Sequence, residues 1–301
     1  MPYVSNSVVQ IGIEEGYFAA QGLAIETVAV KGTSDMLALL ATGEIDAGTP
    51  AMNPGLINAV AAGSKIRLAL PLTVHVEQDC ATAAFVARTD DVESGRYSDP
   101  ADWKGARVML SPAGLQGTGG YFLTQALALG GLTLDDVEVH KAEAAVFGEA
   151  LRSGQVDIAV ALEPWITRIT SDGGVSQLMP IEPLVDGLQS SAIVFSESLM
   201  ADTEAAQRFA VAYMLAVRQY AQGATPRNVG IVSAFTGLAP DLVQRLCWSY
   251  APIDGSINTQ SLNTYQEWLL GEGLIDRILK PEEYIDTRFV DEAVRRLDGS
   301  R

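Results

Sequence analysis

Along the chain, hydrophobic and polar positions switch between the spacing of a helix and that of a strand. Residues 5–7 can cap a helix whose apolar stripe runs from Val8 through Phe18, and Gly22 can end it. The stretch that follows, residues 23–30, predicts a strand. The chain therefore opens on a helix followed by a strand.

The next elements continue this alternation. Residues 35–42 predict a helix that Ser34 caps and Gly43 ends, and residues 45–48 predict a short buried strand. Strands that alternate with helices are typical of α/β proteins with a parallel sheet.

The same pattern occurs twice. Residues 22–28 are echoed by residues 131–137, and residues 40–46 are echoed by residues 151–157, at nearly equal offsets of 109 and 111 residues. Solenoid repeats are much shorter, about 20 to 50 residues. The repetition therefore predicts two similar α/β lobes in tandem.

Two further strands, at residues 85–88 and 191–195, are interpreted as crossings between the lobes. We expect lobe I to comprise residues 1–86 plus 193–301 and lobe II residues 87–192. Each lobe is expected to be a mostly parallel sheet flanked by helices, with a ligand cleft between the lobes. The late part of the chain predicts helices that pack back on lobe I, at residues 202–222, 228–235, 262–271 and 287–297.

Composition narrows the class of protein. The 301 residues are 48% hydrophobic and 19% charged, as in ordinary folded domains. Lys and Arg total 20 against 37 Asp and Glu, a formal charge of −17, which argues against nucleic acid or an anionic membrane as partner. Apolar runs stay far below the roughly 18 residues of a membrane span.

Cysteine and histidine indicate no metal or cofactor chemistry. Cys80 and Cys247 lie far apart, and His75 and His140 are isolated, so no zinc-ligand spacing occurs. For the two cysteines, buried free thiols are favoured over a single bridge. We expect no metal and no cofactor.

A set of motifs lies at residues 12–18, 21–23, 40–48, 102–108, 154–157 and 163–165. In their order and spacing these motifs resemble a known family, the binding proteins of ABC importers for nitrate, taurine, aliphatic sulfonates and thiamine-precursor pyrimidines. This resemblance covers nearly the whole chain. It implies the two-lobed fold of periplasmic binding proteins and capture of a small molecule by closure of the lobes.

In open parallel sheets, ligands bind beyond the carboxyl ends of the strands, where loops lead into helices. The resemblance implies the same loops. The candidate ligand residues in these loops are Ser5, Asn6, Thr33, Ser34, Asn53, His75, Gln78, Ser111, Gln116, Thr118, Gly119, Glu163 and Trp165.

Three of these positions carry chemical arguments. A helix that begins near Thr118 could hold an acidic group through its backbone N–H groups, unless Thr118 merely caps that helix. Trp165 could stack on a ligand, unless it packs between lobe helices. Glu163 would repel an anion and could receive an amine. We therefore favour a neutral or nitrogen-bearing organic ligand, heteroaromatic ones included, over sulfonate or nitrate.

Two alternatives to transport stay open: an enzyme on the same fold, of the pyrimidine-synthesis or menaquinone-pathway type, and a ligand-sensing receptor domain. A Schiff-base enzyme needs a lysine in the cleft. None of the five lysines falls in a ligand loop of lobe II, and only Lys31 lies near a predicted site. We therefore expect a non-enzymatic, monomeric protein that works with ABC permease subunits.

The repeat also bears on the start of the chain. Residues 106–110 predict a strand whose counterpart in lobe I would lie upstream of Met1, with residues 1–3 where it should end. We expect a natural start further upstream that encodes this strand and a signal peptide. The expected location is periplasmic or extracytoplasmic, with contact to a membrane only through the permease or an N-terminal anchor.

Overall fold

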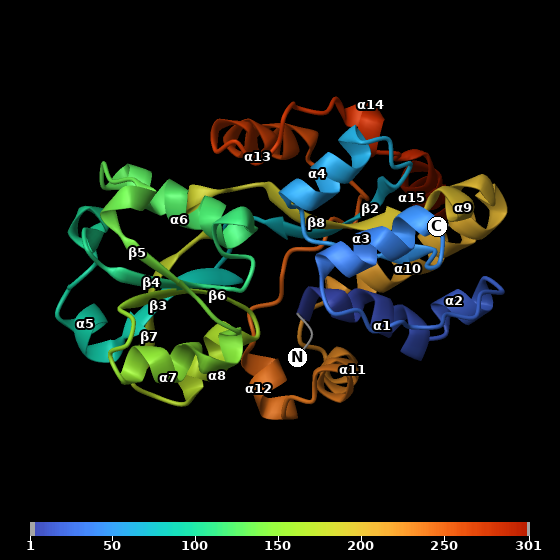
Figure 1. Cartoon of the computed structure of the whole chain (residues 1–301). Coiled ribbons are helices and arrows are strands. Elements are labelled where there is room, and N and C mark those ends of the chain that lie inside the picture. The colour runs from blue at the N-terminus through green and yellow to red at the C-terminus, as the bar shows by residue number, and fades with distance from the viewer. Residues whose placement is uncertain (1–3, 300–301) are drawn as a thin grey trace. The chain divides into compact units, whose positions relative to one another are not determined.

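The computed structural model describes residues 4–299, so the expected strand end at residues 1–3 lies outside the described residues. The chain forms two compact units: unit 1 (Met1–Val74, Leu188–Val243 and Trp248–Arg301) and unit 2 (His75–Gly187 and Gln244–Cys247). Figure 1 shows the elements of each unit. The lobe boundaries expected from the sequence stay a prediction.

Unit 1 has a sheet with strand order β1 (Ala47–Gly48), β8 (Leu188–Phe195) and β2 (Arg67–His75), in which β1 and β8 are antiparallel. The helices of this unit are α1 (Ser7–Glu14), α2 (Tyr17–Ala20), α3 (Thr33–Thr42), α4 (Pro54–Ala61), α9 (Glu197–Ala201), α10 (Thr203–Tyr220), α11 (Pro226–Thr236), α13 (Thr259–Gly271), α14 (Pro281–Tyr284) and α15 (Arg288–Gly299). Helix α12 (Pro240–Arg245) begins in unit 1 and ends in unit 2. A short 3-10 helix, Val4–Asn6, precedes α1.

Aromatic side chains join these helices to the sheet. The Phe195 ring of β8 meets the ring of Phe209 in α10 edge-on at 5.4 Å and lies 5.8 Å from the ring of Phe289 in α15. The hydroxyl of Tyr213 in α10 donates to the backbone oxygen of Pro71 in β2 at 2.7 Å. Large rings contribute much of the burial energy of a core, so α10 anchors unit 1.

Unit 2 contains a five-stranded sheet with the order β5 (Glu138–Lys141), β4 (Arg107–Leu110), β6 (Ile158–Leu162), β3 (Ala83–Arg88) and β7 (Val175–Pro180). Strands β5, β4 and β6 are parallel, as expected, whereas β3 runs antiparallel to both β6 and β7. The α/β class is therefore confirmed, and the parallel pairing in this sheet is confined to three strands.

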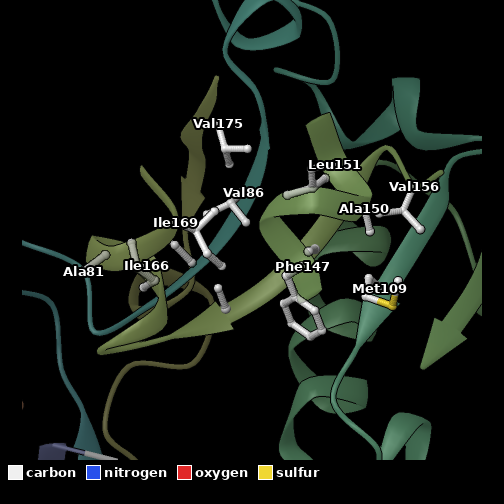
Figure 2. Packing of buried hydrophobic residues seen from close by; sticks show 13 residues of the cluster. Ala81, Val86, Met109, Phe147, Ala150, Leu151, Val156, Ile166, Ile169 and Val175 are labelled. Carbon is white, nitrogen blue, oxygen red and sulfur yellow. The ribbon is translucent and has the colours of Figure 1, made fainter. Parts of the chain in front are cut away.

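Helices cover both faces of this sheet: α6 (Thr118–Leu129) lies on one face and α7 (Phe147–Arg152) with α8 (Trp165–Ser171) on the other (Figure 1). Shorter turns complete the unit: α5 (Thr89–Glu93) and the 3-10 helices Pro100–Trp103, Gly114–Gln116, Leu134–Asp136, Ala144–Val146 and Glu182–Leu184. Figure 2 shows buried side chains of this part of the core, among them Val86 of β3, Phe147 of α7 and Ile166 of α8.

The repeat has a structural basis. Gly22, Gly43, Gly131 and Gly154 all adopt left-handed φ angles, of 72°, 74°, 66° and 72°. A residue with a Cβ is disfavoured in this conformation, and glycine commonly ends a helix in this way. The structural interpretation of these glycines is confirmed.

Three sequence expectations need correction. Residues 23–30 are not a strand, and α3 begins at Thr33 after Gly32 rather than behind a capping Ser34. Cys80 and Cys247 are not free thiols, because they form a disulfide. A strand needs a hydrogen-bonded neighbour and a disulfide needs spatial proximity, and neither is visible in a local pattern.

Candidate functional site

The carboxyl ends of three parallel strands meet at one edge of the unit 2 sheet. Leu110 at the end of β4 lies opposite Lys141 at the end of β5, and Met109 lies opposite Ala159 of β6. Ser111 and Glu163 directly follow β4 and β6. The structure thus brings these two predicted residues to the edge where α/β proteins bind ligands.

Helix α6 begins at this edge. A Cβ added to Gly119 would lie 3.7 Å from Cδ2 of Leu110 and 3.9 Å from Cγ1 of Val160, so the first turn sits against β4 and β6. Gly117 is the N-cap, and no side chain caps the helix. The alternative in which Thr118 caps α6 is therefore wrong. An uncapped N-terminus offers N–H groups and a partial positive charge to an acidic group.

The first turn of α6 and the 3-10 helix before it leave little room for side chains at two glycines. A Cβ on Gly120 would lie 2.4 Å from the backbone oxygen of Leu115, and one on Gly114 would lie 2.5 Å from Cδ of Lys141. The 3-10 helix Gly114–Gln116, which contains the predicted Gln116, is thereby held against α6 and β5. Gly120 is required because backbone approaches it closely, and Gly114 is favoured because its φ of +57° is left-handed.

Lys141 is a residue that the sequence analysis missed. It belongs to β5 rather than to a loop, but its stem packs against Gly114 at the ligand edge. No lysine falls in a ligand loop of lobe II, but Lys31 is not the only lysine near a predicted site. The sequence analysis predicted no strand at residues 138–141, so only the strand pairing in the structure places Lys141 beside Gly114.

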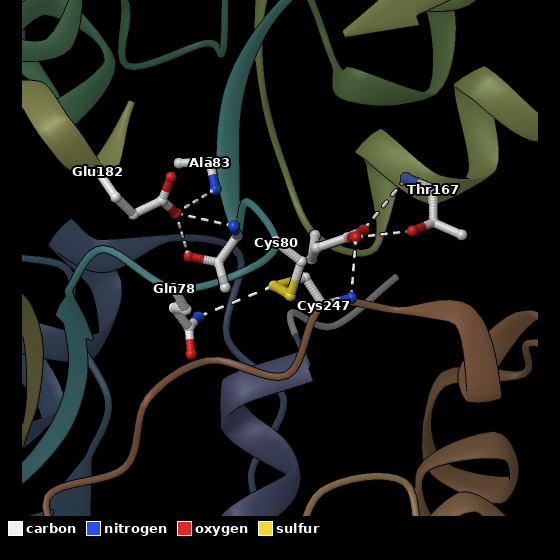
Figure 3. Close-up of a disulfide and its surroundings, with 8 residues drawn as sticks. Gln78, Cys80, Ala83, Thr167, Glu182 and Cys247 are labelled. Carbon is white, nitrogen blue, oxygen red and sulfur yellow. Dashed lines mark hydrogen bonds between the residues drawn. A yellow bond between two sulfur atoms is a disulfide. The ribbon is translucent and has the colours of Figure 1, made fainter. Parts of the chain in front are cut away.

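Glu163 is buried, with 6% of its surface exposed. Its carboxylate accepts hydrogen bonds from the backbone N–H of Thr167 (3.1 Å), the hydroxyl of Thr167 (2.6 Å) and the backbone N–H of Cys247 (3.2 Å; Figure 3). Burial raises the pKa of Glu163, against the lowering effect of these bonds. Three donors of the chain therefore already occupy this carboxylate, and its binding of a ligand amine stays a prediction.

Trp165 opens α8 and is half-buried. Its indole packs against the cluster of Figure 2, and the guanidinium carbon of Arg168 lies 5.3 Å from the ring centroid. These contacts give the ring a structural role. Stacking on a ligand stays a prediction.

His75 and Gln78 lie where β2 leads into unit 2. His75 is 1% exposed, and its ring meets that of Phe122 edge-on at 5.2 Å. Burial lowers the pKa of His75 to about 4, although the nearby charge of Glu182 acts to raise it. The side-chain amide of Gln78 donates to Sγ of Cys247 at 3.8 Å. His75 is therefore a neutral, buried side chain near neutral pH.

The candidates of unit 1 occupy the starts of three helices. Ser5 and Asn6 belong to the turn before α1, Thr33 and Ser34 open α3, and Asn53 precedes α4. The Asn53 side-chain oxygen accepts the backbone N–H of Leu56 at 3.0 Å, which makes it the cap of α4. A ligand contact of these five residues stays a prediction.

Each unit has a pocket among the residues that the structure describes. A cavity of about 520 Å³ in unit 2 is lined by Glu163, Thr167, Ser176 and the disulfide, with Asp79 and Arg245 among its other lining residues. A cavity of about 310 Å³ in unit 1 is lined by Lys65, Arg67 and Arg288 and contains no predicted residue. Among the predicted ligand residues, only Glu163 lines either cavity.

Two absences hold for the part of the chain that the structure describes. No cluster of three or more His, Cys, Asp or Glu side chains there could bind a metal ion. Between residues 4 and 299, every helix is too short or too polar to cross a membrane.

The chain has two units, each with a sheet and helices. Residues 7–222 match the family model described as NMT1/THI5 like, so the chain belongs to this family. No curated protein sequence matches the chain. The family resemblance found in the sequence is thereby confirmed.

Solved structures share the fold across the chain. One is the ligand-binding component of an ABC-type import system from Staphylococcus aureus, with zinc bound (TM-score 0.80, 13% identity, 98% of this chain and 97% of that one). Another is the periplasmic aliphatic sulphonate binding protein SsuA from Escherichia coli (TM-score 0.71, 16% identity, 94% of both chains). The desulfurization enzyme DszB is also similar (TM-score 0.68, 18% identity, 96% of both chains).

Proposed function

We propose that this protein is the solute-binding component of an ABC importer, which captures a small molecule and delivers it unchanged to the permease. The observation that carries the proposal is the match of nearly the whole chain to an import component, with 98% of this chain covered. Membership in the NMT1/THI5-like family supports it. The chain is proposed to act as a monomer.

The ligand is proposed to be a neutral or nitrogen-bearing organic molecule, with heteroaromatic compounds included. The edge of the unit 2 sheet offers it the hydroxyl of Ser111 and the uncapped start of α6. Lys141 beside Gly114 adds a cation there, which could take an acidic group carried by the same molecule. Sulfonate and nitrate are the competing ligands in any screen.

The location is proposed to be extracytoplasmic. The Cys80–Cys247 disulfide supports this, because disulfides persist in oxidising compartments and are rare in the cytosol. The import component and the periplasmic SsuA among the similar structures agree with that location.

Native mass spectrometry tests the proposal. The chain is purified and exposed to a panel of pyrimidines, amines, sulfonates and nitrate, and compounds that raise its melting temperature are recovered from the complex. We expect one compound bound per chain and released with unchanged mass. A ligand released as a chemically altered product would contradict a transport role.

An enzyme is the second candidate, because DszB shares the fold over 96% of this chain. The buried neutral His75 and the occupied carboxylate of Glu163 do not favour acid–base chemistry in unit 2. Incubation of each bound compound with the chain, followed by mass analysis of the whole solution, separates turnover from binding.

A further inference from the structure

A short segment in the C-terminal part of the chain belongs to unit 2, although the residues on either side of it belong to unit 1. Gln244–Cys247 belongs to unit 2, whereas the residues before and after it, up to Val243 and from Trp248, belong to unit 1. The disulfide bonds this stretch to Cys80, 167 residues earlier (Figure 3). Residues 244–247 therefore leave unit 1, and the last of them is covalently bonded to Cys80 of unit 2.

Noncovalent contacts hold the same stretch. The N–H of Cys247 donates to Glu163, and Leu246 and Cys247 are buried, with 5% and 4% of their surfaces exposed. Glu163 is itself tied to the sheet, because its own N–H donates to the backbone oxygen of Thr82. The preceding Gln244 and Arg245 are exposed.

The next residue is fixed to unit 1. The ring of Trp248 lies 5.1 Å from that of Tyr220, a buried side chain of α10. Cys247 and Trp248 are adjacent, so a single peptide bond links a residue fixed to one unit with a residue fixed to the other.

The other two connections lie together. They fall at residues 74/75 and 187/188, and the N–H of Gly187 donates to the backbone oxygen of His75 at 2.6 Å. Two neighbouring connections act as one pivot for hinge motion. A third attachment restricts that motion for as long as it holds.

The two halves of the disulfide differ in burial, because Cys80 is exposed while Cys247 is buried. A thiolate of a dithiol reductant attacks Sγ of Cys80, the S–S bond breaks, and its electron pair leaves on the sulfur of Cys247, which takes up a proton. The second thiol of the reductant then displaces Cys80 as a thiol. The reductant leaves as a disulfide, having supplied two electrons and two protons.

We propose that the Cys80–Cys247 disulfide is a redox-sensitive latch: it fixes Gln244–Cys247 to unit 2, and a dithiol releases this segment and frees the two units to move. The proposal rests on the proposed function, since closure around a solute requires such motion. Its tests below need no ligand, so they can fail independently of that function.

Hydrogen exchange of the full chain gives the first test, with oxidised protein compared with protein reduced by dithiothreitol and with a Cys80→Ser/Cys247→Ser variant. The amides of Leu246 and Cys247 are expected to exchange at least about tenfold faster after release, ahead of the amides of β4 in the same unit. Unchanged exchange of these two amides would overturn the latch. Acceleration only in step with β4 would also overturn it, because the disulfide would then stabilise unit 2 as a whole.

Spin labels give the second test. Maleimide labels are attached at Val28→Cys in unit 1 and Leu129→Cys in unit 2, since the native side chains are 56% and 66% exposed. The distance distribution is measured with the disulfide intact and in the double serine background. A broader distribution without the disulfide is expected, and equal widths would refute a role of the latch in motion between the units.

Discussion

Asp157 is the last residue of the second copy of the repeated motif, and its buried carboxylate forms ion pairs with two arginines. It accepts hydrogen bonds from the backbone N–H and the Nε of Arg107 at 3.0 and 2.9 Å, and from Nη2 of Arg107 at 2.8 Å. Arg88 adds a contact of 3.4 Å. Burial acts to raise the pKa of Asp157, but the bonds from Arg107 outweigh it and lower the pKa.

Replacement of Asp157 by Asn should lower the free energy of unfolding by about 2 kcal/mol, the usual loss for hydrogen bonds to a charged group. Because folding lowers the pKa of this carboxyl, its contribution is complete above the unfolded pKa and is lost as the pH falls through the folded pKa. Urea titrations at neutral and acidic pH measure both effects.

The control is Asp46→Asn, at the matching position of the first motif, where the side chain is exposed. We expect a change below about 0.5 kcal/mol there. Equal losses at both positions would refute the specific role of the Asp157 pairs.

His75 should make the protein acid-sensitive. Folding lowers its pKa from 6.5 to about 4, so between these values the unfolded state binds more protons. Stability should therefore fall as the pH drops from 6.5 toward 4, by on the order of 2 to 3 kcal/mol from this group.

Denaturation of His75→Gln over this range should show a shallower pH dependence than the parent chain. The matched control is His140→Gln, at a half-exposed side chain that contacts Glu138. If His75→Gln and the parent lose stability in parallel, another group is responsible.

For single residues, the sequence predicted the place of a side chain in the fold better than the contacts that the side chain makes. It placed Ser111 and Glu163 at the ends of strands, which the structure confirms. It could not show that Glu163 is occupied by Thr167 and Cys247, because the Cys247 contact spans 84 residues of sequence. Lys141 was missed for the same reason, since its proximity to Gly114 depends on strand pairing.

Among the elements, α6 with its preceding turn contributes most to the candidate site. Gly120→Ala should destabilise the chain by about 1 to 3 kcal/mol, because the added Cβ would meet the backbone oxygen of Leu115 at 2.4 Å. Thermal denaturation measures the loss.

Gly119→Ala is the matched variant one residue away. Its Cβ would meet only ordinary contacts at 3.7 and 3.9 Å, so the fold should keep its stability. If ligand approaches the first turn of α6, this variant should bind the panel compound at least about tenfold more weakly, as calorimetry would show. Unchanged affinity would place the ligand elsewhere.

Helices were predictable from the sequence to a greater extent than strands. The expected helix at residues 202–222 corresponds to α10, Thr203–Tyr220, because its apolar side chains follow the helical period over 18 residues. Residues 23–30 also have a strand-like composition, yet they form no strand. Pairing with a neighbour decides strand formation, and the sequence does not show which strands are neighbours.

At the scale of the whole molecule, the repeat and the family motifs predicted two α/β units, and the fold confirms this class. The disulfide was not predictable, because a pair of cysteines separated by 167 residues gives no local signal of proximity. The lobe boundaries and the ligand residues stay predictions until a ligand is bound.

Small-angle X-ray scattering tests the central claim most directly. The chain is measured alone and with a saturating amount of the panel compound that raises its melting temperature most. A ligand that contacts both units favours the state in which they are closed around it. The account predicts a smaller radius of gyration with the compound, and an unchanged radius at saturation would contradict capture by closure.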